Sequence, residues 1–157
     1  MPSLNDVRRW LDDRQVEVLT FVEETPTAAT AARAVGCSPA EIAKSILFLI
    51  GGQPVLVVTS GDMKVKSSLL KKAAGLTGKV RLPAAEEVLD RTGYAPGGVC
   101  PFLLPDELPV LLDESLWRFA TVYPAGGDDH SAVPLSPDRL ARLVAGRRAG
   151  ICIPLGD

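Results

Sequence analysis

The longest uncharged apolar stretch of this chain is SILFLIGGQPVLVVTSG, from Ser45 to Gly61, and the turn sequence GGQP interrupts it at its centre. Glycine adopts positive φ freely and proline has no backbone N–H to donate, so together they end regular structure. The stretch is therefore too broken to cross a membrane as one helix. Its two arms, SILFLI and VLVVTS, predict a β-hairpin whose strands are buried on both faces.

Helix and strand signals alternate on both sides of this hairpin. Ser3 precedes a stretch with apolar residues on one helical face, and Ser38 with Glu41 three residues later forms a capping box. We therefore expect Lys44 to lie where a short helix gives way to the hairpin. The segments expected to be helical are 4–14, 27–36, 38–44, 66–74, 83–93 and 137–146, and the further expected strands are 16–22, 79–82, 108–113, 118–127, 131–136 and 151–154.

Length and composition predict one domain over residues 1–157, with a mixed α/β (α+β) fold around a central, partly antiparallel sheet. The hydrophobic share of 46% and the charged share of 23% are those of an ordinary globular protein. The N-terminal sequence is charged almost from its start and lacks the apolar core of a signal peptide, so a cytoplasmic location is expected. Three widely separated cysteines without a C-x-x-C pair argue against a disulfide framework and against a zinc site.

The overall charge gives no general case for nucleic-acid binding, because 17 lysines and arginines stand against 19 acidic residues. Two local clusters differ from this average. Six basic residues and no acidic one occur between Met63 and Ala85, and four arginines occur near the C-terminus. Either cluster alone would be typical of a solvated helix face, but two of them favour a patch that faces phosphates. The two clusters are Lys64, Lys66, Lys71, Lys72, Lys79 and Arg81, and Arg139, Arg142, Arg147 and Arg148.

Standard catalytic motifs are absent from the sequence, which has no G-x-S-x-G, Walker, G-x-G-x-x-G or H-E-x-x-H pattern. His130 is the only histidine, which excludes a multi-histidine metal site. Cys100 with His130 could form a thiol nucleophile, although a cysteine between apolar residues is usually inert. Lys44 is an isolated cation at the start of the apolar hairpin. Its ammonium either reaches water or binds a phosphate or carboxylate.

The segment GYAPGGVCPF, residues 93–102, holds three glycines and two prolines. Such a loop is either a tight structural turn or a surface where backbone N–H groups face a ligand.

Four stretches follow one another along the chain: EIAKSILFLIGGQPVLVVTSGD, TGYAPGGVCPF, VLLDESL and TVYPAGG. In this order and spacing they resemble the YbaK/prolyl-tRNA synthetase editing-domain family, whose members hydrolyse wrongly charged aminoacyl-tRNA. The likeness runs from about Thr20 to Gly146 and depends most on the I-A-K-S lysine and the G-x-x-x-P loop, Gly97 to Pro101. It implies a central mixed, largely antiparallel, barrel-like sheet with surrounding helices, and neither cofactor nor metal.

The resemblance also implies a site. Lys44 would hold the terminal adenosine of tRNA or its phosphate, and Lys44, Gly97 and Gly98 are the expected catalytic residues. The residues expected to contact the substrate are Thr20, Phe21, Ser45, Val99, Cys100, Pro101, Phe102, Gly126 and His130, and those expected to contact tRNA phosphates are Lys64, Lys66, Lys71 and Lys72. Asp113, Gly126 and Gly127 match family positions with a structural role. Asp128, Asp129 and His130 do not match the family's pattern cleanly, so their role stays open.

The primary hypothesis is a stand-alone trans-editing deacylase for a small mischarged amino acid such as Ala, Cys, Ser or Thr. In the family the 2′-OH of the tRNA helps to position or activate the water. The expected partner is the acceptor end of mischarged tRNA, with an aminoacyl-tRNA synthetase as a second partner; membrane and DNA are not expected. Monomer and homodimer stay open. The alternatives are a non-catalytic paralogue that binds aminoacyl-tRNA or a nucleotide, and a thiol enzyme based on Cys100.

Overall fold

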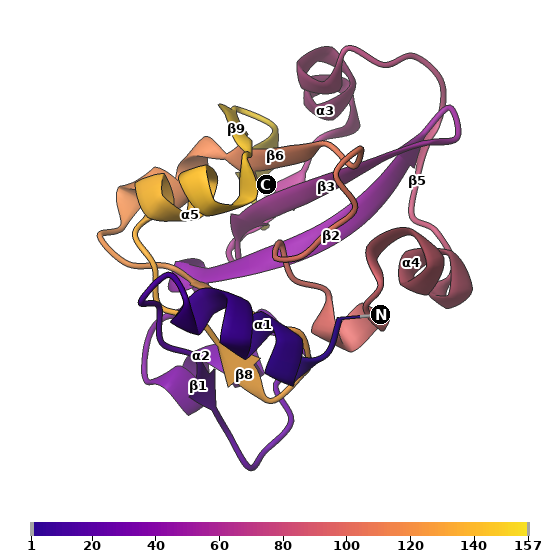
Figure 1. The fold of residues 1–157 in the computed structure, drawn as a ribbon. Coiled ribbons are helices and arrows are strands. Elements are labelled where there is room, and N and C mark those ends of the chain that lie inside the picture. The colour runs from indigo at the N-terminus through magenta and orange to yellow at the C-terminus, as the bar shows by residue number, and fades with distance from the viewer. Residues whose placement is uncertain (1, 157) are drawn as a thin grey trace.

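The computed structural model describes residues 2–156, and a mixed sheet lies at its centre (Figure 1). The strand order is β5–β2–β3–β6–β9, and β7 pairs with β2 beside this path. The strands are β2 (Ile42–Ile50), β3 (Gln53–Ser60), β5 (Val80–Arg81), β6 (Val110–Asp113), β7 (Tyr123–Pro124) and β9 (Arg147–Ala149). Two small two-stranded sheets are formed by β1 (Leu19–Thr20) with β8 (Ser131–Ala132) and by β4 (Met63–Val65) with β10 (Cys152–Pro154).

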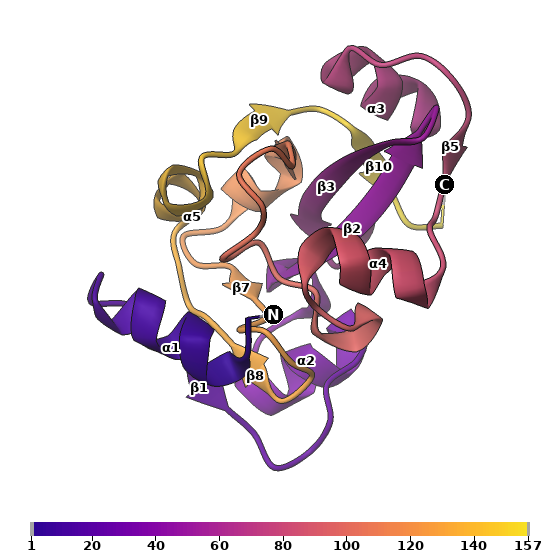
Figure 2. The same cartoon turned by 45° about the vertical axis from the view of Figure 1, so that its right-hand side comes forward.

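Five α-helices and three short 3-10 helices are described around these sheets. The helices are α1 (Leu4–Asp12), α2 (Ala28–Val35), α3 (Ser67–Ala74), α4 (Ala85–Thr92) and α5 (Pro137–Val144), and the 3-10 turns are η1 (Pro39–Glu41), η2 (Pro96–Gly98) and η3 (Glu114–Arg118). In Figure 2, α1 and α5 lie on one side of the sheet and α3 lies at its top, near the hairpin. Within residues 2–156 there is no helix with both the length and the hydropathy that crossing a bilayer requires.

The predicted hairpin is confirmed. Strands β2 and β3 pair antiparallel from Ala43 opposite Ser60 to Ile50 opposite Gln53. The turn between them needs its glycines, because Gly51 and Gly52 have φ of 55° and 84°. A Cβ atom on Gly51 would also lie 2.5 Å from the carbonyl oxygen of Thr77.

The two faces of this hairpin pack against different cores, as the alternation of side chains along a strand requires. Leu47 and Val58 belong to the larger core, which also receives α1 and α5. Ile50 and Val57 belong to a smaller core, which is closed by Leu70 of α3. Both arms are therefore buried on two faces, as their continuous apolar runs predicted.

Several predicted boundaries are wrong. The expected strand over 16–22 is reduced to β1, because Val16 closes the C-terminal turn of α1 and only the short β8 is available for pairing. The expected strand over 118–127 is reduced to β7, because only Ile42 and Ala43 of β2 pair with it. The expected helix over 38–44 is the single turn η1, so Lys44 lies inside β2 and not at its entrance. The strands β4 and β9 were not expected.

The central sheet is mixed, with parallel pairs β2–β7, β3–β6 and β6–β9 and antiparallel pairs β2–β3 and β2–β5. The expected barrel-like closure is not confirmed, because the sheet ends at β5 on one side and at β9 on the other. The crossover connections between parallel strands could not be read from the local patterns that predicted the strands.

Asp113 joins the sheet to the C-terminal segment. Asp113 is 1% exposed, and its carboxylate accepts three backbone hydrogen bonds, one from the N–H of Ser115 and two from the N–H groups of Ile151 and Cys152. A buried carboxylate needs such donors to offset its loss of hydration. The match of Asp113 to a structural family position therefore has a physical basis.

Asp113→Ala should destabilise the protein by about 3 kcal/mol or more, because it leaves three N–H groups near the core without an acceptor, each worth about 1–3 kcal/mol. The matched control is Asp62→Ala, which removes an exposed ion pair to Arg118 (2.7 Å) and should cost at most about 1 kcal/mol. Urea unfolding measures both. Equal losses for the two variants would contradict the anchoring role of Asp113.

Candidate functional site

One edge of β2 is only partly paired. Strand β3 fills the other edge, while β7 pairs with Ile42 and Ala43 and β5 pairs with Leu49 and Ile50. The N–H of Gly61 donates to the carbonyl of Ile42, which places the main-chain groups of even-numbered residues toward β3. The main chain of Ser45 and Leu47 therefore points to the edge between β7 and β5, where no described strand pairs with it.

A cavity of about 100 Å³ lies against this partly paired edge. Its walls are the 25–28 segment with Ala31 of α2, the start of β2, the 96–99 loop, and the strands β7 and β8 with Ala125. Most of the lining side chains are small, and Lys44 is the only charged residue among them. The site thus joins the lysine and the glycine-rich loop that the sequence had singled out separately.

Lys44 and Ser45 both line the cavity although their side chains leave β2 on opposite faces. Burial lowers the pKa of Lys44 from its ordinary value of 10.5, and Cys152 and Asp62 act against this shift. The hydroxyl of Ser45 is buried and has no hydrogen-bond partner within residues 2–156. The buried hydroxyl of Ser60 in β3 is in the same condition, and each such group carries the cost of its lost hydration.

The glycine-rich loop is a structural turn, and part of it also lines the cavity. A Cβ atom on Gly98 would lie 2.8 Å from the Cα of Asp128, so the backbones pack directly against each other there. A Cβ atom on Gly97 would meet only the Asp129 side chain, at 3.9 Å, and Gly97 lines the cavity. The hydroxyl of the buried Tyr94 donates to the carbonyl of Phe102 at 2.5 Å and ties the loop together.

The other predicted contact residues lie elsewhere. Cys100 and Phe102 belong to the core, with exposures of 0% and 1%. Pro101 lines a separate hollow beside Trp10 of α1. Thr20 pairs with Ser131, and the N–H of Phe21 donates to the carbonyl of His130. Both residues therefore hold the segment that contains the lining residue Ser131, but they do not line the cavity themselves. The residues predicted as substrate contacts that do line it are Ser45 and Val99.

Sequence reasoning missed the wall formed by residues 25–28 and Ala31. A signal was present, because Ala28 and Ala31 lie three residues apart on one face of a helix and leave room beside it. Gly126 also has a support role, since its N–H donates to the hydroxyl of Ser131 at 2.9 Å.

Asp129 and His130 form the rim of the site with the 21–25 segment. The N–H and the hydroxyl of Thr25 both donate to the carbonyl of Asp129. His130 lies between two acceptors, with Nδ1 at 3.1 Å from the carbonyl of Glu23 and Nε2 at 3.2 Å from the Asp129 carboxylate. The ligand atoms of Glu24, Asp129 and His130 lie within 4.8 Å of one another, so this cluster can hold a cation.

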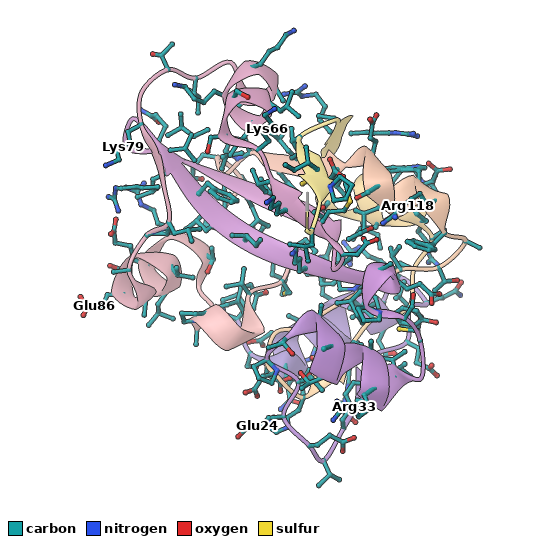
Figure 3. The ribbon with its side chains drawn as sticks, turned by 180° about the vertical axis from the view of Figure 1, so that it is seen from behind. Glu24, Arg33, Lys66, Lys79, Glu86 and Arg118 are labelled. Carbon is teal, nitrogen blue, oxygen red and sulfur yellow. The ribbon has the colours of Figure 1, made fainter. Side chains whose placement is uncertain are left out.

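The basic residues between 64 and 81 are spread over and around α3. Figure 3 shows Lys66 on the rear side of the molecule, beside the long strands, and Lys79 near the tip of the hairpin. Lys71 and Lys72 lie in the last turn of α3. Arg81 pairs with Glu87 at 3.3 Å, so a local partner engages it.

Comparison with known proteins gives a consistent picture. The model of the aminoacyl-tRNA editing domain matches residues 22–143. The protein YwhH of Bacillus subtilis (strain 168) is 40% identical over 146 residues, which cover 90% of each chain. The proline–tRNA ligase of Aquifex aeolicus (strain VF5) is 36% identical over 80 residues, which are half of this chain but only 14% of the ligase.

Solved structures agree with these matches. A candidate trans-editing enzyme for prolyl-tRNA synthetase superposes with a TM-score of 0.86 and 31% identity, covering 96% of this chain and 97% of the other. The hypothetical protein APE2540 superposes with a TM-score of 0.84 and 32% identity, covering 94% and 99% of the two chains.

We expect Gly97→Ala to fold normally, because the added methyl group meets no backbone atom. The variant should bind a ligand of the cavity more weakly, because Gly97 lines a space of only about 100 Å³. Gly98→Ala should instead lower the free energy of unfolding by about 1–3 kcal/mol, because its methyl group collides with the main chain of Asp128. Thermal unfolding and ligand titration separate the two effects. A destabilised Gly97→Ala, or a fully stable Gly98→Ala, would contradict this assignment.

Cys100 should resist alkylation in the folded protein, because burial raises the pKa of its thiol to about 12 and the thiolate is the reactive form. Iodoacetamide treatment near neutral pH, followed by peptide mass mapping, should modify the half-buried Cys37 first and Cys100 only in urea. Rapid native modification of Cys100 would revive the thiol-enzyme hypothesis.

Proposed function

The chain belongs to the aminoacyl-tRNA editing domain family, and on that premise we propose that it is a stand-alone deacylase that hydrolyses the ester of a mischarged aminoacyl-tRNA. The observation that carries the proposal is the small cavity that Lys44 and Gly97 line together against the partly paired edge of β2. Lys44 binds the 3′-terminal adenosine or its phosphate. The 96–99 loop and Ser45 surround the aminoacyl group.

The size of the cavity supports a small amino acid. Its volume of about 100 Å³ is well below the roughly 300–1,000 Å³ of ordinary ligand pockets and equals the liquid volume of about three water molecules. Ala28, Ala31 and Ala43 form much of the wall. Alanine, serine, cysteine and threonine are the amino acids of matching size in this proposal, and each added group changes selectivity by only about 1–3 kcal/mol.

Hydrolysis of the ester requires few catalytic groups from the protein. An aminoacyl ester is already activated, so positioning and one or two hydrogen bonds to the developing oxyanion suffice. In this proposal the main chain at Gly97 and Val99 supplies the polar groups beside the ester, because the N–H of Gly98 already donates to the carbonyl of Ala95. The 2′-OH of the terminal ribose positions the attacking water, and this group also distinguishes RNA from DNA.

The tRNA is the remaining part of the substrate. In this proposal four lysines meet phosphates of the acceptor stem. Lys64 lies on β4, Lys66 lies at the start of α3, and Lys71 and Lys72 lie within α3. The likeness to proline–tRNA ligases and to a candidate trans-editing enzyme for prolyl-tRNA synthetase supports tRNA(Pro) as the carrier and that synthetase as a partner. A non-catalytic protein that only binds aminoacyl-tRNA is the alternative that the following experiment excludes or supports.

Lys44→Ala should lower kcat/KM for deacylation by about 10²–10³-fold, the usual loss for one key polar group of an active site. Its stability should not fall, because burial already disfavours the charged lysine. Tests use tRNA charged with Ala, Cys, Ser, Thr and Pro, each corrected for spontaneous hydrolysis. Arg8→Ala on the exposed side of α1 is the charge-removal control.

Lys44-dependent hydrolysis of one or two of these species establishes the function and names the amino acid. Full activity of Lys44→Ala would reject the proposed role of the lysine. Tight binding of aminoacyl-tRNA by wild type without hydrolysis would favour the non-catalytic alternative.

A further inference from the structure

The side chain of Lys44 leaves β2 on the face of the smaller core. Phe48 and Ile50 of the same strand pack in that core, and side chains an even number of positions apart share a face of a strand. Ser45 leaves the strand on the opposite face. The ammonium of Lys44 therefore extends to the other side of the sheet from the side chain of Ser45, and the groups that hold it there have not yet been considered.

A chain of contacts connects Lys44 to a charged pair on this face. Thr59 of β3 is the partner of Lys44 in the β2–β3 register, and its hydroxyl lies 3.5 Å from that of Ser115 in η3. The carbonyl of Ser115 accepts a hydrogen bond from Nε of Arg118 at 2.8 Å. Asp62 follows directly after the end of β3 and pairs with Arg118. Both charged residues are thus brought to the end of the hairpin at which Lys44 lies.

Arg118 holds the carboxylate of Asp62 at both oxygens. Nη1 of Arg118 lies 3.1 Å from Oδ2 and Nη2 lies 2.7 Å from Oδ1, so the ion pair is bidentate. The main chain of Asp62 is also held, because its carbonyl accepts a hydrogen bond from the N–H of Leu155. Figure 3 shows Arg118 toward the end of the long strands that lies away from Lys79 and the hairpin tip. The carboxylate is therefore fixed in position.

The electrostatic effect of this carboxylate reaches Lys44. Burial lowers the pKa of Lys44, and Cys152 of β10 and Asp62 oppose that shift. Cys152 is neutral near neutral pH, because burial raises the pKa of its thiol to about 12. Asp62 is therefore the group that supplies negative charge. Further titratable or charged residues of the neighbouring elements are Glu41 of η1, Lys64 of β4, Asp113 of β6, Glu114 and Arg118 of η3, and Tyr123 of β7.

We propose that Asp62 is a positioning residue for Lys44, and that Arg118 holds its carboxylate in place as the counter-charge of the ammonium. This inference rests on the proposed deacylase function, in which Lys44 binds the nucleotide end of the substrate. Two cations and one carboxylate leave this cluster with a net positive charge, so it still attracts a phosphate. Without Asp62 the half-buried amine would lose its proton more readily, and a neutral amine no longer attracts an anion.

The first test follows the titration of Lys44 itself and needs no substrate. Protein labelled with ¹³C at the ε-carbon of lysine reports each amine by NMR, and the Lys44 signal is the one that Lys44→Ala loses. Asp62→Asn should lower the pKa of Lys44, because it removes an opposite charge. Arg118→Met should raise this pKa, because it removes a cation and leaves the carboxylate to Lys44 alone. A merely structural role would not shift the two variants in opposite directions.

The second test is the pH dependence of deacylation, measured with the charged tRNA that wild type hydrolyses and corrected for spontaneous hydrolysis. Lys44 acts as a cation, which is present below its pKa and lost as the pH rises through it. Asp62→Asn should therefore match wild type at about pH 6 and lose about 3–10-fold in kcat/KM at about pH 8.5. Glu114→Gln removes the same charge from an exposed position of η3 and should behave as wild type at both pH values.

An unchanged titration of Lys44 in Asp62→Asn, or shifts of the same sign in the two variants, would overturn the inference and leave the deacylase function intact. An equal loss of kcat/KM at both pH values would also overturn it, because that loss would reflect a structural role. If the two titrations shift as expected but wild type hydrolyses no charged tRNA, the proposed function fails. The role of Asp62 in the reaction then fails with it, and only its pairing with Lys44 stands.

Discussion

The antiparallel pairing of β2 with β3 organises the rest of the structure, because it fills one edge of β2 and leaves the other to be shared. β7 and β5 take the two ends of that edge, and between them no described strand pairs with Ser45 or Leu47. An unpaired edge normally attracts another strand. Here the 96–99 loop and the start of α2 lie beside it, and the cavity is the space left between them.

Much of the fold could be predicted where local signals were strong. The glycine turn, the long apolar arms of the hairpin and the cap of α1 at Ser3 specify their own conformation, since each signal acts within a few residues. The predictions of strands over 16–22 and 118–127 were wrong for a different reason. A strand exists only where a partner is available, and the partners of β1 and β7 are set by the packing of distant segments.

In the candidate site, too, local signals could be read from the sequence and the packing of distant segments could not. Lys44 and Gly97 could be found from the sequence because each stands out chemically in its surroundings. The wall around Thr25 was missed and the role of Asp129 stayed open, because more than 100 positions separate Thr25 from the Asp129 carbonyl that it binds. Cys100 and Phe102 were expected to contact substrate but are buried, since the apolar half of the loop belongs to the core.

The central claim is that the cavity between β2 and the 96–99 loop receives the aminoacyl end of tRNA. The most direct measurement is an amide chemical-shift titration of ¹⁵N-labelled protein with a non-hydrolysable alanyl-adenosine amide. The account predicts that the shifts will concentrate at Thr25, Ser45, Gly97 and Val99. Shifts confined to the larger hollow near Arg91 and Arg147, with none at these four residues, would contradict it.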